Sequence, residues 1–173
     1  MNLAALQWLK GEPSEWKGMR INHSMCGQGF HGLQDAIGLD PGRNWGMGIV
    51  RKNVLTAYWG KFPEVEYPHD YFDVIGDFIA NWLPPKVPAK IVCVEGASFG
   101  EKFGQILLED IRLSFVLAFK KRGFDVVLVP PKTARKVVLG GGNIKASEIW
   151  VSLNSNGADG ACLGLYGAGY KGD

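Results

Sequence analysis

Three acidic residues stand beside apolar segments at comparable intervals along the chain. Asp40 ends the run AIGLD before a Pro-Gly turn, Glu95 ends KIVCVE, and Asp159 opens the apolar segment DGACLGLYGA. Carboxylates are preferred ligands of divalent cations, and a glycine-rich turn lets the backbone approach a phosphate. Each acid alone also fits a turn or a helix cap, and for Asp40 in DPG that reading is as good as the other. The three together predict a metal site.

The chemistry that such a set of acids suits is phosphodiester hydrolysis. Two divalent ions about 4 Å apart can activate the attacking water and stabilise the leaving oxygen. Magnesium takes a few carboxylates and keeps several waters, so acids from a turn, a strand end and a helix start meet its needs. Asp159 at a helix start would also lie at the positive end of the helix dipole, which favours the ionised carboxylate.

The elements that position these acids follow from the hydrophobic pattern. Residues 36–40, 45–52 and 54–62 are predicted to form three consecutive strands in an antiparallel meander. The segments that follow are predicted as a helix over 71–82, a strand over 90–94, a helix from Phe103 to Gly123, a strand over 126–129 of the kind buried in a parallel sheet, short helices over 133–139 and 145–153, and a helix over 158–169. The fold class is therefore α/β, a mixed five-stranded sheet flanked by helices.

The last predicted helix carries four glycines, at 160, 164, 167 and 169. Each costs about 1 kcal/mol relative to alanine inside a helix, which disfavours the assignment. Small residues spaced four apart nevertheless allow a helix to approach a sheet closely, and on that ground the segment is predicted to be helical.

Residues 1–35 differ from the rest because they show no sustained periodicity, and we interpret them as an appended arm before a domain over 36–173. His23, Cys26 and His31 could bind zinc at H-x2-C-x4-H spacing, which would make the arm a metal-bearing interaction module. A structural zinc site normally has four ligands and no second cysteine is near, so a loop with incidental polar residues is the preferred interpretation.

Composition limits the class of protein. A chain of 173 residues with 46% hydrophobic residues fits one globular domain. Its apolar runs are strand-sized, the start lacks the pattern of a signal peptide, and three cysteines cannot pair completely. We therefore expect a soluble, cytoplasmic protein in a reducing compartment, with no membrane partner.

Basic residues gather between Glu95 and Asp159, although the net charge of +2 does not by itself indicate a nucleic-acid binder. The cluster is a solvated face or a phosphate-binding surface, and its position between two candidate metal ligands favours the second. Phe99 follows Glu95 and could stack on an unpaired base, whereas Phe103 fits the apolar stripe of its helix. The basic residues concerned are Lys132, Arg135, Lys136 and Lys145.

Four motifs in this order resemble the RuvC-type Holliday junction resolvases of the RNase H-like (retroviral integrase) superfamily. They are LDPG with its glycine-rich strand, VCVEGASF, PPKTARKVVLGGGNIK and ADGACLGLYGA, within residues 36 to about 169. The resemblance implies an RNase H-like fold and two Mg²⁺ ions, replaceable by Mn²⁺, on Asp40, Glu95 and Asp159. It further implies a homodimer that nicks two opposing strands of a four-way DNA junction and leaves 5′-phosphates, with Lys145 beside the scissile phosphate. The host would be a bacterium, with the protein on the nucleoid or encoded by a phage.

The chain departs from the family pattern at Asn156, where a fourth ligand, Asp or His, is usual. An amide oxygen can coordinate a hard cation without adding charge, so affinity for one metal would fall. Two other classes stay open. A non-catalytic or broad-specificity RNase H-like module that binds branched nucleic acid is favoured by Asn156, whereas a sugar-kinase or actin-like ATPase is disfavoured because 173 residues leave no room for its second domain.

Overall fold

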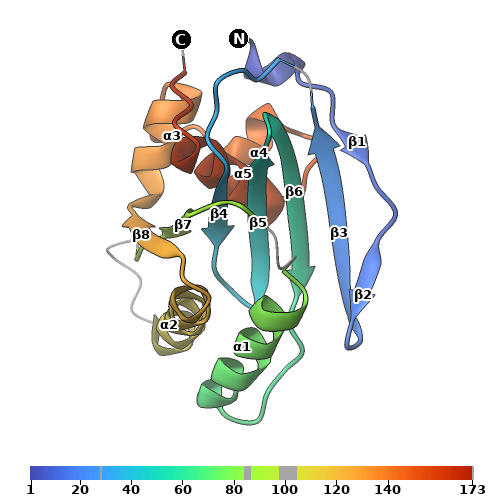
Figure 1. Ribbon diagram of the computed structural model, residues 1–173, viewed down its shortest axis with the longest axis vertical. Coiled ribbons are helices and arrows are strands. Elements are labelled where there is room, and N and C mark those ends of the chain that lie inside the picture. Colours follow the sequence, from blue (N-terminus) through green and yellow to red (C-terminus); the bar gives the residue numbers. More distant parts are fainter. Residues whose placement is uncertain (28, 84–86, 98–104, 173) are drawn as a thin grey trace.

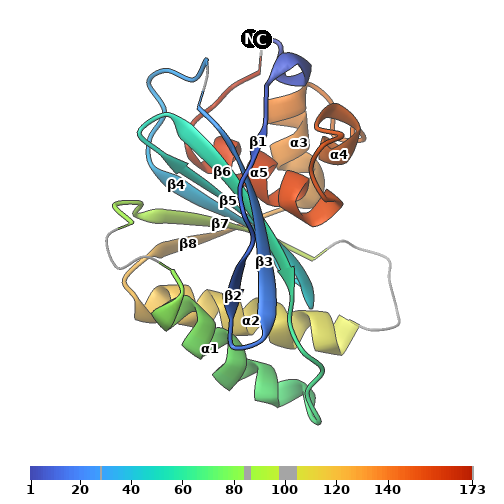
Figure 2. The same cartoon turned by 90° about the vertical axis from the view of Figure 1, so that its right-hand side faces the viewer.

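The chain forms one mixed sheet with helices on both faces (Figures 1 and 2). The computed structural model describes residues 1–27, 29–83, 87–97 and 105–172. The strands are β1 (Leu9–Lys10), β2 (Ser14–Trp16), β3 (Met19–Cys26), β4 (Ala36–Asp40), β5 (Asn44–Arg51), β6 (Val54–Lys61), β7 (Ile91–Glu95) and β8 (Asp125–Val129). The helices are α1 (Tyr71–Asn81), α2 (Gln105–Lys121), α3 (Pro131–Leu139), α4 (Ala146–Ile149) and α5 (Ser155–Gly167), with 3-10 turns at Leu3–Ala5 and Pro68–Asp70.

The predicted meander and mixed sheet are confirmed. Strands β4, β5 and β6 are antiparallel neighbours, and β7 and β8 continue the sheet parallel to β4. The turn between β5 and β6 consists of Lys52 and Asn53, both with positive φ, of 50° and 62°. Two successive residues of that conformation match the twist of a two-residue hairpin, so the turn fixes the register of the two strands.

Residues before Ala36 extend this sheet to eight strands, in the order β1-β3-β6-β5-β4-β7-β8 with β2 also paired to β3. Strands β1, β2 and β3 of this region were not predicted from the sequence. Strand β3 pairs with β6 from Ile21↔Gly60 to Cys26↔Leu55. Its period-2 pattern is hidden because small or polar residues such as Ser24 occupy buried positions on one face. The division into an arm over residues 1–35 and a domain over residues 36–173 stays a prediction.

The face of the sheet toward α1 and α2 packs through aromatic side chains. Trp45, Phe62, Phe78 and Phe115 are fully buried there. Trp45 and Phe78 have ring centroids 5.1 Å apart, and Phe62 and Phe78 are 5.4 Å apart. Helices α1 and α2 lie together on this face of the sheet (Figure 2), and the rings fill the space between helices and sheet.

The opposite face, toward α3, α4 and α5, packs through glycines. A Cβ added at Gly46 would lie 1.7 Å from the backbone oxygen of Asn156, and one at Gly48 would lie 2.4 Å from that of Gly160. A Cβ at Gly38 would lie 2.0 Å from the backbone nitrogen of Gly164. Helix α5 therefore rests on the backbone of β4 and β5, and this close packing explains why its glycines are compatible with a helix.

Strand β8 is an edge strand, not the buried interior strand that its continuous apolar run predicted. Val127 is 45% exposed and Leu128 is 58% exposed. Helix α2 carries two further exposed apolar side chains, Leu113 and Leu117. An apolar run shows that a strand avoids polar contacts but does not tell whether another part of the same chain covers it.

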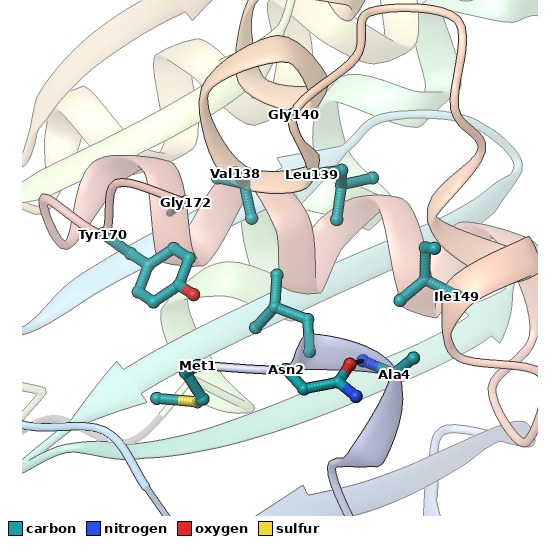
Figure 3. A pocket seen from close by; sticks show the side chains of 10 residues that line it. Met1, Asn2, Ala4, Val138, Leu139, Gly140, Ile149, Tyr170 and Gly172 are labelled. Carbon is teal, nitrogen blue, oxygen red and sulfur yellow. Dashed lines mark hydrogen bonds between the residues drawn. The ribbon is translucent and has the colours of Figure 1, made fainter.

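The N-terminal turn packs against the last elements of the chain. The indole nitrogen of Trp150 donates a hydrogen bond to the backbone oxygen of Leu3 at 3.0 Å. A cavity of about 220 Å³ separates this turn from α3, α4 and Tyr170, and its lining side chains are uncharged (Figure 3). The contact fastens the N-terminus to α3 and α4 and carries no group suited to catalysis.

Candidate metal and nucleic-acid site

The predicted acids of β4 and β7 meet at the carboxyl ends of these two adjacent parallel strands. Leu39 pairs with Val94, so the residues that follow, Asp40 and Glu95, end neighbouring strands side by side. Both line a cavity of about 390 Å³, together with Asn156, Arg43 and Arg112. The sheet register alone brings these two carboxylates together.

Asp159 reaches this region from α5. The side chain of Asn154 caps the helix by accepting hydrogen bonds from the backbone nitrogens of Asn156, at 2.9 Å, and Gly157, at 3.4 Å. Asn156 and Asp159 are three residues apart and share one side of the helix. One carboxylate oxygen of Asp159 accepts a hydrogen bond from the guanidinium of Arg135 at 3.1 Å, and both side chains are 22% exposed.

The three acids form an anionic cluster with raised pKa values. Burial raises the pKa of Asp40 well above its usual range, and the charges of Glu95 and Asp159 raise it further. Burial and the charge of Asp159 raise the pKa of Glu95, and burial raises that of Asp159. The positive charge of Arg135 lowers each of these pKa values only in part. A cation bound here would stabilise the ionised carboxylates.

The donor atoms suit magnesium. No described residue donates a hydrogen bond to the side chain of Asp40 or Glu95, so their oxygens are available for a cation. Two carboxylates and the amide oxygen of Asn156 in one cavity fit an ion that keeps several waters. Across the described ranges no three His, Cys, Asp or Glu side chains are grouped as a complete ligand set, and Asp159 is directed to Arg135. The assignment of Asp40, Glu95, Asp159 and Asn156 as metal ligands stays a prediction.

The predicted basic residues divide into two groups. Arg135 of α3 lies inside the site through its ion pair with Asp159. Lys132 and Lys136 are exposed on the same helix, and exposed Lys145 directly precedes α4 without lining the carboxylate cavity. Phe99, predicted to contact DNA, lies outside the described residues, as does Phe103.

Sequence reasoning missed Arg112 of α2. Its Nε donates a hydrogen bond to the backbone oxygen of Glu95 at 2.9 Å, and its Nη1 bonds the carboxylate of Glu109. Its side chain is only 13% exposed. Arg112 follows Ile111, which belongs to the apolar stripe of the predicted helix, and this position was a sequence signal for a partly buried basic side chain. The sequence could not place Arg112 beside Glu95, because the packing of α2 over the end of β7 depends on tertiary contacts.

The alternative zinc site in residues 23–31 is wrong for a geometric reason. His23 and Cys26 lie on opposite faces of β3, because side chains alternate along a strand. His23 stacks on Tyr58 with centroids 5.6 Å apart, and Cys26 is fully buried. Cys93 and Cys162 are buried as well, and burial raises the pKa of Cys93 to about 11 and that of Cys162 to about 12. Such thiols are protonated and unreactive at neutral pH.

Comparison with solved structures defines the class of fold. The chain is similar to the structure of Thermus thermophilus RuvC, with a TM-score of 0.61, 16% sequence identity, and coverage of 76% of this chain and 92% of that chain. It is also similar to T. thermophilus RuvC in complex with a Holliday junction substrate, with a TM-score of 0.60, 17% identity, and coverage of 76% and 90%. No protein-family model and no curated protein matches the chain.

The chain therefore has a mixed α/β fold of the RNase H-like type, structurally similar to that of RuvC. At this level of identity the likeness establishes the fold alone. Within the described part of the chain, no helix has both the length and the apolar character needed to cross a membrane.

Proposed function

We propose that this protein is a magnesium-dependent endonuclease that resolves four-way DNA junctions by paired nicks. The observation that carries the proposal is the meeting of Asp40 and Glu95 at adjacent strand ends, with Asn156 in the same cavity and Asp159 beside it on α5. A structural neighbour that binds a Holliday junction supports the choice of substrate. A cytoplasmic location, with access to DNA, accords with this role.

Each of the site residues has its own role in the proposed reaction. Asp40, Glu95 and Asn156 hold Mg²⁺ or Mn²⁺, and Asp159 completes the set for a second ion. Bound metal would activate a water molecule and stabilise the leaving 3′-oxygen, so that the product carries a 5′-phosphate. Arg112 fixes the backbone of Glu95, and Arg135 balances the charge of Asp159 while no metal is bound. Lys132, Lys136 and Lys145 contact DNA phosphates, and Phe99 stacks on a base at the junction.

Paired nicks require two active sites, and we propose that they come from a homodimer. Exposed apolar side chains on α2 and β8 support this, because such side chains favour burial against a partner. They are Leu113, Leu117, Val127 and Leu128. Light scattering on wild type and on Leu117→Glu tests it. We expect wild type to be a dimer and Leu117→Glu to be a monomer. A monomeric wild type would contradict the proposed homodimer.

A nuclease assay with a synthetic four-way junction and a linear duplex tests the activity. Wild type is expected to cut the junction in Mg²⁺, whereas Asp40→Asn, Glu95→Gln and Asp159→Asn should each lose about 100-fold or more, since even outer-shell changes at metal sites cost 10–100-fold. Junction binding should persist in all three. Cutting retained by one variant would remove that residue from the metal set.

A second candidate function is a non-catalytic module that binds branched nucleic acid. It is favoured by Asn156 in a ligand position and by the pairing of Asp159 with Arg135. Intact junction binding without cleavage in Mg²⁺ or Mn²⁺ would select it. If Asn156 is a ligand, Asn156→Asp should strengthen metal binding in calorimetry, and an unchanged affinity would show that it is not.

A further inference from the structure

A second groove adjoins the carboxylate cavity on the glycine-packed face of the sheet. It has a volume of about 330 Å³ and is lined by Arg20, Asn22, Trp59, Lys61, Asn44 and Asn156. Asn44 and Asn156 line the carboxylate cavity as well. The two spaces therefore adjoin at these two residues, where the start of α5 lies over Gly46.

The strand register places the groove directly beside Asp40. Asn22 pairs with Trp59, Trp59 with Gly46, and Gly46 with Asp40, so these residues form one row across β3, β6, β5 and β4. Adjacent strands are about 4.8 Å apart, which puts Asn22 about 14 Å from Asp40. A nucleic-acid strand would therefore need only a few nucleotides to span the distance between the carboxylates and the groove.

The lining of the groove suits a single nucleic-acid strand. Arg20 and Lys61 are exposed, and neither forms an ion pair with any residue in the described ranges. Asparagine amides provide donors and acceptors, and the half-buried ring of Trp59 is held against α5, since a Cβ at Gly157 would lie 2.7 Å from it. Cations, amides and an aromatic ring along one track are typical of surfaces that bind single strands.

Glu15 is in register with Arg20 on β2 but does not line the groove. Among the described residues that line the groove, Arg20 and Lys61 are the charged ones and none is acidic.

We infer that this groove binds one strand of the DNA substrate as it leaves the carboxylate cavity. Arg20 and Lys61 contact its phosphates, and Trp59 supports a sugar or base. The inference rests on the proposed function and extends it, because Arg20 and Asn22 belong to β3, the strand that residues before Ala36 add to the sheet. The N-terminal extension thereby becomes part of the substrate-binding surface.

Fluorescence anisotropy with a labelled four-way junction tests the groove in EDTA, at several salt concentrations. The double variant Arg20→Ala/Lys61→Ala should bind about fivefold or more weakly at low salt, with the salt slope reduced by about 2. Arg51→Ala is the matched control, because Arg51 is an exposed arginine at the far end of β5. It should bind as wild type does.

Two results would contradict the inference that the groove binds DNA. One is equal binding by the double variant and Arg51→Ala. The other is an equal loss in Arg20→Lys/Lys61→Arg, which keeps both charges and should bind like wild type. Because the assay contains no metal and measures no cleavage, an absence of nuclease activity leaves this readout intact, and the two proposals can fail separately.

Discussion

The two faces of the sheet are packed in opposite ways. Toward α1 and α2, large rings such as Trp45 and Phe78 fill the space between helix and sheet. Toward α5, glycines leave backbone against backbone, with Gly46 beneath Asn156. The candidate site lies at the end of the glycine-packed face, because only there does a helix come close enough for its first turns to join residues at the strand ends.

The difference explains what each helix contributes. Asn156 of α5 enters the carboxylate cavity directly, with Asp159 one turn further on beside Arg135. Helix α2, on the aromatic face, contributes Arg112 through a long side chain that reaches the backbone of Glu95. Aromatic packing thus stabilises the fold, whereas glycine packing brings α5 close enough to the sheet to place short acidic and amide side chains at the site.

The largest expected effect is on the aromatic face. Phe78→Ala should lower the free energy of unfolding by about 3–5 kcal/mol, because it removes a fully buried ring that contacts four other aromatic rings. Urea denaturation measures it. Phe78→Leu should cost clearly less, and equal losses in the two variants would show that cavity volume is not the cause.

The next effect is on the glycine face. Gly46→Ala should cost about 1–3 kcal/mol and displace the start of α5, since the new Cβ would meet the backbone of Asn156. Thermal melts with and without Mg²⁺ should show a lower Tm and a reduced metal-induced rise. Gly76→Ala is the control, because a Cβ at this helical position of α1 meets nothing within 4 Å. It should stabilise the protein by up to about 1 kcal/mol, and a loss there would refute the packing argument.

The third prediction concerns pH and metal. Because the folded-state pKa of Asp40 is raised, the metal-free folded protein holds a proton that the unfolded chain releases near pH 4. Stability of the metal-free protein should therefore fall as pH rises from about 4 to the raised pKa, and then level off. Mg²⁺ should restore more stability at pH 8 than at pH 5, as measured by Tm.

Asp40→Asn provides the control for that profile. It should raise the Tm of the metal-free protein at pH 8, at about 2–4 °C for each kcal/mol gained, and weaken both the pH dependence and the response to Mg²⁺. A variant with the same pH profile as wild type would show that Asp40 is not the group responsible.

The smallest effect separates two of the three arginines at the site, Arg135 and Arg43. Arg135→Gln should strengthen Mn²⁺ binding about fivefold, or about 1 kcal/mol, because it removes a positive charge and frees Asp159. Calorimetry at pH 8 measures the affinity. Arg43→Gln should change it less, since Arg43 lines the same cavity but pairs with exposed Glu64. Weaker binding by Arg135→Gln would show that the ion pair organises the site for metal.

The sequence predicted the elements from Ala36 onward because each carries a local signal. Strand β4 ends at the predicted Asp40, α1 stops before its prolines, and α5 forms where small residues recur. The prediction failed at β3 and β8. In β3, buried Ser24 obscures the alternation, and in β8 an apolar run gives no information on whether a neighbour covers it.

By itself the sequence determined which residues end strands and begin helices, because turns, caps and periodicity are encoded within a few neighbouring residues. It therefore determined that Asp40 and Glu95 end strands, whereas Asp159, predicted near a helix start, lies one turn inside α5, which begins at Ser155. Only the tertiary structure decided which side chains meet: Arg135 with Asp159, Arg112 with Glu95, and Arg20 beside Trp59. Those contacts depend on strand order, on register and on the distance of α5 from the sheet. All three are set by interactions between residues far apart in the chain.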